Sequence, residues 1–341
     1  MTEEEMVERF KVYLSDQLPD AVNITIDSVR SIVGGASRQT FSMKLNITYR
    51  DSEVLKRVIL RREFESGIIE TKVRTEWDAY RAFFDTRVPV PELLWIEEDP
   101  KWMGTPFFVM EEIVGCQDFF RLFLEPPYHA VREKVGERFC EIMGTIAKTD
   151  PAAVGLEDRL DKPAPDECWQ RELDYWEADI NKDELEPHPV LQAAIRWLRR
   201  NPPPPAQKVG VVHGDMRGGN FMFNIDGEIK AILDWEMMHM GDPLEDLAWS
   251  LNRLFSWEDR DRLGLMLPRE RAIRIWEDVS GFKADREALL WWEIFSSGKG
   301  MAIWISMKEV DAAGKYSNAV WWVGGMCASD LEGRLLLCQR R

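Results

Sequence analysis

The residues best suited to chemistry lie between positions 209 and 236. Asp215 is followed by Asn220 five residues later, and Asp234 lies fourteen residues beyond that. Phosphoryl transfer needs a carboxylate beside the attacking hydroxyl and two oxygen ligands that hold Mg²⁺ against the nucleotide phosphates. Either aspartate alone would more often be a turn or capping residue. The combined spacing instead favours a phosphoryl-transfer site.

Two short apolar segments are expected to position these side chains. Residues 209–212 precede Asp215 and residues 230–233 precede Asp234, and both have the composition of short strands. A glycine-rich loop separates them. We therefore expect one hairpin to deliver all three side chains. His213 is expected to brace the loop as a structural histidine, and Asp242 and Asp246 are expected to brace it or cap a helix.

The N-terminal third has a strand-rich pattern. Apolar and polar residues alternate through 41–49, which predicts a half-buried strand, and residues 54–62 predict the returning strand. Helical spacing predicts helices over 3–18 and 68–84. A further apolar strand is expected over 106–113. This part should form a small sheet with one long helix.

The pattern changes to helical after about residue 113. Helices are expected over 131–146 and 190–200, and again from about 243 onward, where tryptophans are frequent. Four prolines at 202–205 predict an extended spacer. We predict an α+β fold with two domains, 1–112 and 113–341: a small antiparallel-sheet lobe and a larger, mainly helical lobe.

Composition excludes several classes of function. The 341 residues carry 44 Lys and Arg against 60 Asp and Glu, a formal net charge of −16. Nucleic-acid binding needs clustered basic side chains, so no nucleic-acid partner is expected. The five cysteines are far apart, which disfavours a disulfide framework or a thiolate zinc site. The acidic N-terminus and the lack of a long apolar stretch predict a cytoplasmic protein without a membrane segment.

The sequence resembles the aminoglycoside phosphotransferase-like branch of the protein-kinase-like fold, and it is nearest to the kinase-like domains associated with some acyl-CoA dehydrogenases. The resembling segments are HGDMRGGN (213–220), ILDWE (232–236), GDPLEDLAW (241–249), VGGASRQT (33–40), VILR (58–61), VPVP (88–91), FFVME (107–111) and DPAAVG (150–155). They span about residues 25–255. The resemblance implies a bilobal kinase-like fold in which the first lobe binds ATP and the second carries catalysis and the acceptor.

Site residues follow position by position from this resemblance. It implies that Asp215 is the catalytic base and that Asn220 and Asp234 are Mg²⁺ ligands. Arg217, two residues after the base, occupies a position where many protein kinases have a lysine. The resemblance implies that Arg217 neutralises the transferring γ-phosphate.

The resemblance also assigns nucleotide contacts in the first lobe. Arg61 replaces the ATP-anchoring lysine expected at this strand position, a departure from the kinase pattern, and Glu76 is its candidate partner. A solvated strand residue and an exposed helix glutamate are the alternatives for these two. Backbone N–H groups that contact phosphate are assigned to Gly34, Gly35, Ala36 and Ser37. Hinge residues whose backbone contacts adenine are Met110, Glu111 and Ile113.

The implied function is ATP- and Mg²⁺-dependent transfer of the γ-phosphate to a hydroxyl of a small molecule. A catalytically silent, kinase-like nucleotide-binding module is the alternative, and nucleotidyl transfer is a third possibility. Two acceptor types are possible. Acidic side chains such as Asp174 and Glu177 would attract an aminoglycoside, whereas basic side chains such as Arg199 would attract a hydroxyacyl-CoA. The helical tryptophans are expected in the core, with an aromatic acceptor pocket as the alternative.

Overall fold

The computed structural model describes residues 2–32, 38–64, 72–119, 121, 125–256, 259, 261–312 and 321–339. The chain divides into two compact units. Unit 1 comprises Met1–Phe84 with Val90–Val114, and unit 2 comprises Asp85–Pro89 with Gly115–Arg341. Within the described ranges, no helix combines the length and apolar character needed to cross a membrane.

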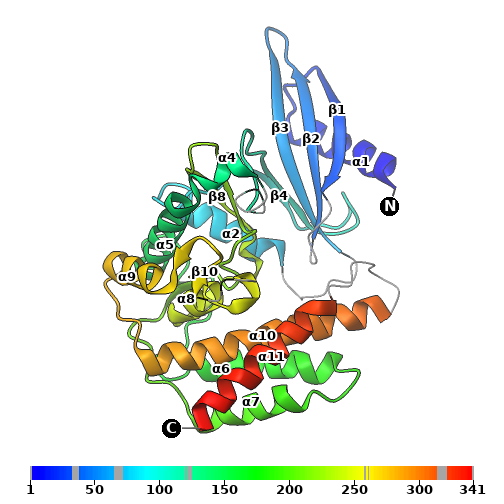
Figure 1. The fold of residues 1–341 in the computed structure, drawn as a ribbon. Helices are drawn as coiled ribbons and strands as arrows, with labels where there is room; N and C mark the ends of the chain where they lie inside the picture. The colour runs from blue at the N-terminus through cyan, green and yellow to red at the C-terminus, as the bar shows by residue number, and fades with distance from the viewer. Residues whose placement is uncertain are drawn as a thin grey trace. The chain divides into compact units, whose positions relative to one another are not determined.

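Unit 1 is built on one antiparallel sheet (Figure 1). Its elements are α1 (Glu3–Gln17), β1 (Asn23–Ile32), β2 (Arg38–Thr48), β3 (Glu53–Glu63), α2 (Val73–Phe83), β4 (Leu93–Glu97) and β5 (Phe107–Glu111). The strand order is β1-β2-β3-β5-β4. Sequence patterns predicted β2, β3 and β5, and a strand without stated bounds was expected before Gly34, where β1 lies; β4 was missed. In β1, Ile24 and Ile26 alternate with polar residues and pack against the core, but a register shift between Ile26 and Ser28 interrupts the alternation.

Alternation along the strands assigns the two faces of the sheet. Phe107 and Val109 of β5 pack in an apolar core with the buried face of α1, which includes Phe10. The intervening Phe108 contacts Trp77 and Tyr80 of α2 instead. Successive strand residues point to opposite faces, so α1 and α2 cover opposite sides of the sheet. Arg61 pairs with Phe108 in register and therefore lies on the α2 side.

A capping box stabilises the first turn of the N-terminal helix α1. Thr2 Oγ1 accepts the Glu5 backbone N–H at 3.2 Å, and the Glu5 carboxylate accepts the Thr2 N–H at 3.0 Å. This pair satisfies two backbone donors that would otherwise lack helical partners. The predicted helix over 3–18 is thus confirmed within one residue of its end.

Unit 2 is mainly helical. Its principal helices are α4 (Pro126–His129), α5 (Arg132–Lys148), α6 (Cys168–Asp183), α7 (Pro189–Arg200), α8 (Leu244–Ser250), α9 (Arg269–Ser280), α10 (Arg286–Ala312) and α11 (Trp321–Gln339). Its strands are β6 (Gly210–Val212), β7 (Phe221–Phe223), β8 (Ile229–Ile232), β9 (His239–Gly241), β10 (Arg262–Leu263) and β11 (Leu267–Pro268), and its short 3₁₀ helices are Trp235–Met237 and Arg253–Phe255.

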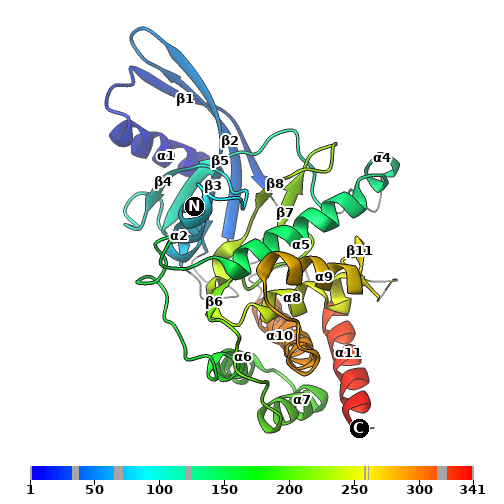
Figure 2. The same ribbon diagram turned by 90° about the vertical axis from the view of Figure 1, so that its left-hand side faces the viewer.

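The helices of unit 2 pack in two groups. The α5 helix lies along α9, and α10 contacts α6, α7, α8 and α11 (Figure 2). Trp291 and Trp292 of α10 are fully buried and pack against each other and Phe295. The core interpretation of these two tryptophans is therefore correct. The α+β fold class is also confirmed, with an antiparallel sheet in unit 1 and a helical unit 2.

The strands around the predicted site do not form one hairpin. The β6 strand pairs with β9, and β7 pairs with β8, each as an antiparallel two-stranded sheet. The prediction that a single hairpin delivers all three site residues is therefore wrong. Asp215 lies in the loop after β6, whereas Asn220 and Asp234 flank the β7–β8 hairpin. The sequence did not reveal the pairing because strands of three or four residues carry little register information.

Candidate active site

The loop between β6 and β7 turns sharply at a glycine. Gly214 has φ +85°, and a Cβ atom there would lie 2.4 Å from the backbone oxygen of Met237. Only glycine adopts this left-handed conformation without strain, and only glycine leaves room for the neighbouring carbonyl. The turn thus sets the direction of the backbone that enters Asp215.

A buried carboxylate holds the start of this loop. Asp246 of α8 accepts the backbone N–H of His213 at 2.8 Å and that of Gly214 at 3.0 Å. Burial raises the pKa of Asp246 to about 6, although these two hydrogen bonds favour its charged form. Asp242 accepts the Leu244 N–H and the Trp292 indole N–H at 3.0 Å each. The prediction that both aspartates brace the loop or a helix is confirmed.

His213 links the two loops that carry the aspartates. The Asp215 backbone N–H donates to His213 Nδ1 at 3.2 Å, and His213 Nε2 lies 3.0 Å from the Leu233 carbonyl oxygen. Burial lowers the pKa of His213 to about 4, so the ring is neutral near pH 7 and its proton belongs on Nε2. Because Leu233 directly precedes Asp234, this histidine is a brace, as predicted.

The Asp215 carboxylate is surrounded by donors. Trp249 Nε1 donates to Oδ1 at 2.7 Å, and Asn220 Nδ2 donates to Oδ2 at 2.6 Å. Arg217 Nε lies 2.9 Å from Oδ1 and 3.1 Å from Oδ2. These three side chains fix the plane of the Asp215 carboxylate, whose side chain is only 13% exposed. Any further hydrogen-bond donor that approaches the Asp215 carboxylate must therefore replace one of these three.

Arg217 is the most accessible of the three donors. Its side chain is 32% exposed, whereas Trp249 and Asn220 are buried. Its guanidinium also donates to the Gly218 carbonyl at 3.1 Å and lies 5.8 Å from the centre of the Phe255 ring. The predicted role of Arg217 at the γ-phosphate stays a prediction, because here it pairs with Asp215.

Asn220 and Asp234 lie at one end of the β7–β8 hairpin. The Leu233 N–H donates to the Asn220 carbonyl at 2.8 Å, which brings Asn220 beside the residue that precedes Asp234. Asn220 Nδ2 also donates to the Asp215 backbone oxygen at 2.8 Å, so Oδ1 is the atom it can offer to a metal. Asp234 adopts a left-handed conformation with φ 68°. An amide and a carboxylate oxygen fit the preference of Mg²⁺ for oxygen donors.

In unit 1, the structure brings Arg61 and Glu76 together. Arg61 Nη1 lies 3.2 Å from Glu76 Oε1, and the Tyr80 hydroxyl donates to the same oxygen at 3.1 Å. The Glu76 side chain is fully buried and that of Arg61 is 10% exposed. The alternatives of a solvated strand arginine and an exposed helix glutamate are therefore wrong. Sequence reasoning missed Arg38, a buried arginine whose Nε lies 4.0 Å from Glu76 Oε2.

The other predicted nucleotide contacts are less defined. Met110 is buried at the end of β5, and the exposed Glu111 uses its backbone N–H to bond the Glu92 carbonyl at 2.9 Å. Ile113 follows this strand as a half-buried residue. The predicted phosphate loop, Gly34, Gly35, Ala36 and Ser37, lies outside the described residues. Nucleotide contacts by any of these residues stay predictions.

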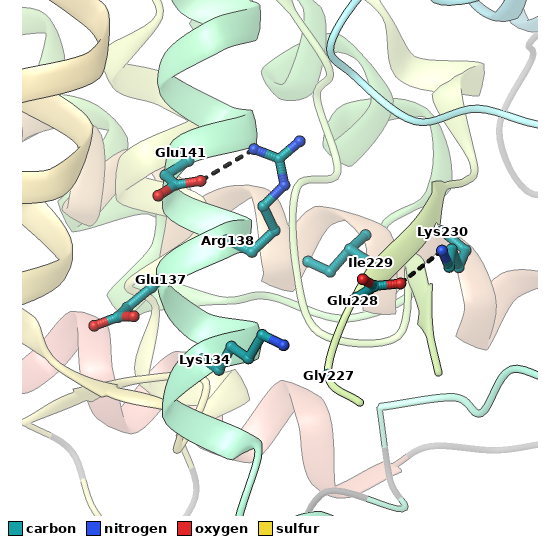
Figure 3. A pocket seen from close by; sticks show the side chains of 8 residues that line it. All are labelled: Lys134, Glu137, Arg138, Glu141, Gly227, Glu228, Ile229 and Lys230. Atoms are coloured by element: carbon teal, nitrogen blue, oxygen red, sulfur yellow. Dashed lines mark hydrogen bonds and ion pairs between the residues drawn. The ribbon is translucent and has the colours of Figure 1, made fainter. Parts of the chain in front are cut away.

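A surface pocket of unit 2 is lined by none of the predicted site residues. It has a volume of about 460 Å³ and lies between α5 and the turn that enters β8 (Figure 3). Arg138 pairs with Glu141 at 3.0 Å, and Lys230 pairs with Glu228 at 2.7 Å. The charges of these side chains neutralise one another, and Asp215 does not line the pocket.

Comparison with known proteins identifies the family. The profile of the phosphotransferase enzyme family matches residues 29–287, about three quarters of the chain. This chain belongs to the phosphotransferase enzyme family. Acyl-CoA dehydrogenase family member 10 of Mus musculus is 29% identical over 210 residues, which make up 60% of this chain and 19% of that protein. The phosphotransferase chain thus spans about a fifth of the length of this relative.

Solved structures share the fold of this phosphotransferase. A putative aminoglycoside phosphotransferase of Ralstonia eutropha JMP134 aligns with a TM-score of 0.69 at 21% identity and covers 96% of this chain and 97% of its own. The aminoglycoside phosphotransferase APH(4)-Ia, in a ternary complex with ADP and hygromycin B, aligns with a TM-score of 0.59 at 17% identity and covers 94% and 97%. The recognised resemblance is therefore confirmed for both family and fold.

Two side chains around Asp215 were not predicted from the sequence. Trp249 stood within a recognised motif but was one tryptophan among 15. Lys299 donates to the Gly214 carbonyl at 2.6 Å, yet it follows Asp215 by 84 residues in the chain. The available signal was a single lysine in the stretch IFSSGKGMAIW of a predicted buried helix. A lysine in such a setting is rarely buried without a specific partner.

Proposed function

We propose that this protein transfers the γ-phosphoryl group of ATP, with Mg²⁺, to a hydroxyl of a small molecule. The observation that carries the proposal is the arrangement of Asp215, Asn220 and Asp234 around one loop and one hairpin end. Membership of the phosphotransferase enzyme family supports the reaction class. The solved complex of APH(4)-Ia with ADP and hygromycin B supports a nucleotide and a small-molecule acceptor.

In this proposal Asp215 orients the acceptor hydroxyl and takes its proton. The hydroxyl oxygen forms the new bond to the γ-phosphorus, the bond from that phosphorus to the β–γ bridging oxygen breaks, and ADP leaves. The hydroxyl needs a lone pair of the Asp215 carboxylate, so one present donor must move. Arg217 is the candidate because it is the most accessible donor, and its charge then becomes available to the transferring phosphoryl group.

Asn220 Oδ1 and the Asp234 carboxylate would hold Mg²⁺, which neutralises phosphate charge when bound. The hydrogen bonds from Asn220 Nδ2 to Asp215 keep the amide oxygen turned away from the base. The backbone link between Asn220 and Leu233 keeps the two ligands at one hairpin end. This chain therefore supplies its oxygen ligands in a fixed arrangement.

For unit 1 we propose nucleotide contacts. Glu76 holds the Arg61 guanidinium in a buried ion pair, which supports Arg61 as the phosphate-anchoring cation in place of lysine. The backbone of Met110, Glu111 and Ile113 remains the proposed adenine contact, and residues 34–37 remain the proposed phosphate contact.

The acceptor is proposed only as a hydroxyl-bearing small molecule. Arg199 donates to Asp174 at 2.6 Å and to Glu177 at 3.1 Å. The acidic face of α6 therefore has a cation of its own, which weakens the case for attraction of a polycationic aminoglycoside. The same pairing occupies Arg199, which weakens the case for a CoA phosphate. The two acceptor types are to be separated by assay.

The test is transfer of labelled γ-phosphate to aminoglycosides, hydroxyacyl-CoA esters and other hydroxylated compounds. We expect transfer to at least one acceptor, and loss of about 100-fold or more for Asp215→Ala with nucleotide affinity retained. Asp161→Ala is the matched control, since that carboxylate is 96% exposed. Near-full transfer by Asp215→Ala would refute the base assignment. Nucleotide binding by the unmodified protein with no transfer would favour the catalytically silent module.

A further inference from the structure

The peptide group between Gly214 and Asp215 is held at both of its polar atoms. Its N–H donates to His213 Nδ1 at 3.2 Å, and its carbonyl oxygen accepts Lys299 Nζ at 2.6 Å. This peptide plane determines where the Asp215 Cα–Cβ bond points. Lys299 thus acts on the geometry of the base from a helix, α10, that is remote in the sequence.

Lys299 is a buried cation in a closely defined environment. It is 1% exposed, and its Nζ pairs with Glu245 Oε1 at 2.9 Å. The ammonium also lies 5.4 Å from the ring centre of Trp176 and 5.2 Å from that of Trp249. Attraction to the faces of aromatic rings is strongest for desolvated cations. A carboxylate, a carbonyl and two rings therefore restrict the position of this ammonium.

Glu245 is itself held in place. Its Oε2 lies 3.1 Å from His239 Nε2, which also lies 3.4 Å from Glu172 Oε1. Two carboxylates thus face two basic side chains, so the protein's own cations balance this cluster. Because Glu245 is held by His239, the ion pair with Glu245 fixes the position of the Lys299 ammonium. A cation held this way can fix a backbone carbonyl with a charge-assisted hydrogen bond.

Trp249 connects the same cation to the base. One face of its ring meets the Lys299 ammonium, while its Nε1–H donates to Asp215 Oδ1 at 2.7 Å. Trp249 is 3% exposed and sits on α8, next to the helix residues that anchor the loop. Lys299 is therefore linked to Asp215 by two indirect contacts, one through the Gly214 carbonyl and one through the Trp249 indole ring.

We propose that Lys299 and Trp249 are positioning residues that hold the Asp215 carboxylate in the orientation required by the acceptor hydroxyl. This inference rests on the proposed function, since it assumes that Asp215 is the base. Catalysis by a positioned base depends on sub-ångström placement, and misplacement by about 1 Å can cost about 100-fold in rate. Neither residue has to touch ATP or Mg²⁺, so their effect should fall on kcat.

The first experiment replaces Trp249 by phenylalanine. Trp249→Phe keeps an aromatic ring facing Lys299 but deletes the N–H that holds Asp215 Oδ1. We expect kcat to fall by about tenfold or more, while KM for ATP and the Kd for Mg·ADP stay within about twofold. Trp291→Phe is the matched control, since Trp291 is equally buried and donates to the Leu198 carbonyl at 3.1 Å. Trp291→Phe should lose about as much thermal stability as Trp249→Phe does, but its kcat should stay at the wild-type value.

The second experiment removes the cation without leaving a buried charge unpaired. The double variant Lys299→Met/Glu245→Gln neutralises both partners, so we expect it to fold and to bind Mg·ADP normally while kcat falls by at least tenfold. In Lys299→Arg, which keeps a charged donor, kcat should be closer to wild type than in the double variant. Equal kcat in the wild type and the double variant would overturn the role of Lys299.

The outcomes separate this inference from the proposed function. If the unmodified protein transfers phosphate but Trp249→Phe behaves like Trp291→Phe, the positioning role is wrong and the kinase function stands. If the unmodified protein transfers no phosphate to any acceptor, the proposed function fails before the variants are compared. A parallel loss of kcat and of Mg·ADP affinity in Trp249→Phe would instead indicate general disruption and would also overturn the positioning role.

Discussion

Replacement of His239 by glutamine should change how the stability of unit 2 depends on pH. His239 Nε2 faces Glu172 and Glu245, its Nδ1 lies 3.0 Å from the Met237 carbonyl oxygen, and Lys299 is bound to Glu245 nearby. Burial alone lowers the pKa of His239, but the two carboxylates outweigh it and raise this pKa from 6.5 to about 9. The imidazolium therefore stabilises the folded state.

The magnitude follows from the two pKa values. A pKa that is higher in the folded than in the unfolded chain gives stability that is fully present below pH 6.5 and is lost as the pH rises to about 9. Each pKa unit corresponds to about 1.4 kcal/mol, so the wild type should lose about 3 kcal/mol from this residue between pH 6 and pH 9. His239→Gln lacks this contribution at every pH.

Urea unfolding at several pH values between 6 and 9 tests this prediction. The difference in unfolding free energy between wild type and His239→Gln should shrink by about 3 kcal/mol as the pH rises through this range. His129→Gln, which alters an exposed histidine of α4, is the control and should keep the wild-type slope. A difference between wild type and His239→Gln that is constant with pH would refute the proposed charge state of the cluster.

Three further predictions concern the site itself. Asp234→Ala should weaken Mg·ATP binding by about tenfold or more, measured by titration calorimetry, while Asp226→Ala in the β7–β8 turn should not; equal affinities would exclude Asp234 as a ligand. Arg61→Ala should raise KM for ATP and Arg61→Lys should restore most of the loss, whereas an unchanged KM in Arg61→Ala would leave Arg61 with a structural role only. Gly214→Ala should lower kcat at least tenfold and destabilise the protein by about 1–2 kcal/mol, because its Cβ meets a carbonyl oxygen at a positive φ. Gly333→Ala, which has open space around its Cβ, is the control, and wild-type kcat in Gly214→Ala would contradict the loop geometry.

Local features were readable from the sequence because they depend on neighbouring residues. The alternation in β2 predicted that strand, and the turn after it predicted β3 as the returning strand. The register of β3 with β5 then placed Arg61 on the face covered by α2. The HGD motif likewise identified Asp215, since its spacing to Asn220 is set within a single loop. Patterns of this kind carry their information within a few residues.

Features that depend on distant contacts could not be read in the same way. The pairing of β6 with β9 joins segments separated by the whole β7–β8 hairpin, and a three-residue strand carries too little pattern to specify it. Arg38 and Lys299 are charged residues whose burial becomes evident only when their partners are known. Charged residues are expected at the surface by default, and these two are buried because tertiary contacts supply them with partners.

The hydrogen bond from Lys299 to the Gly214 carbonyl limits how far the C-terminus of this protein can be truncated. The family match ends at residue 287, twelve residues before Lys299. A fragment trimmed to that boundary would keep every recognised motif but lose the ammonium that holds the loop carbonyl, together with most of α10. During synthesis, the Gly214 carbonyl can gain this hydrogen bond only after α10 has been made and has docked. Expression boundaries chosen from motifs alone would therefore yield a chain that has the recognised residues but lacks this support of the Asp215 loop.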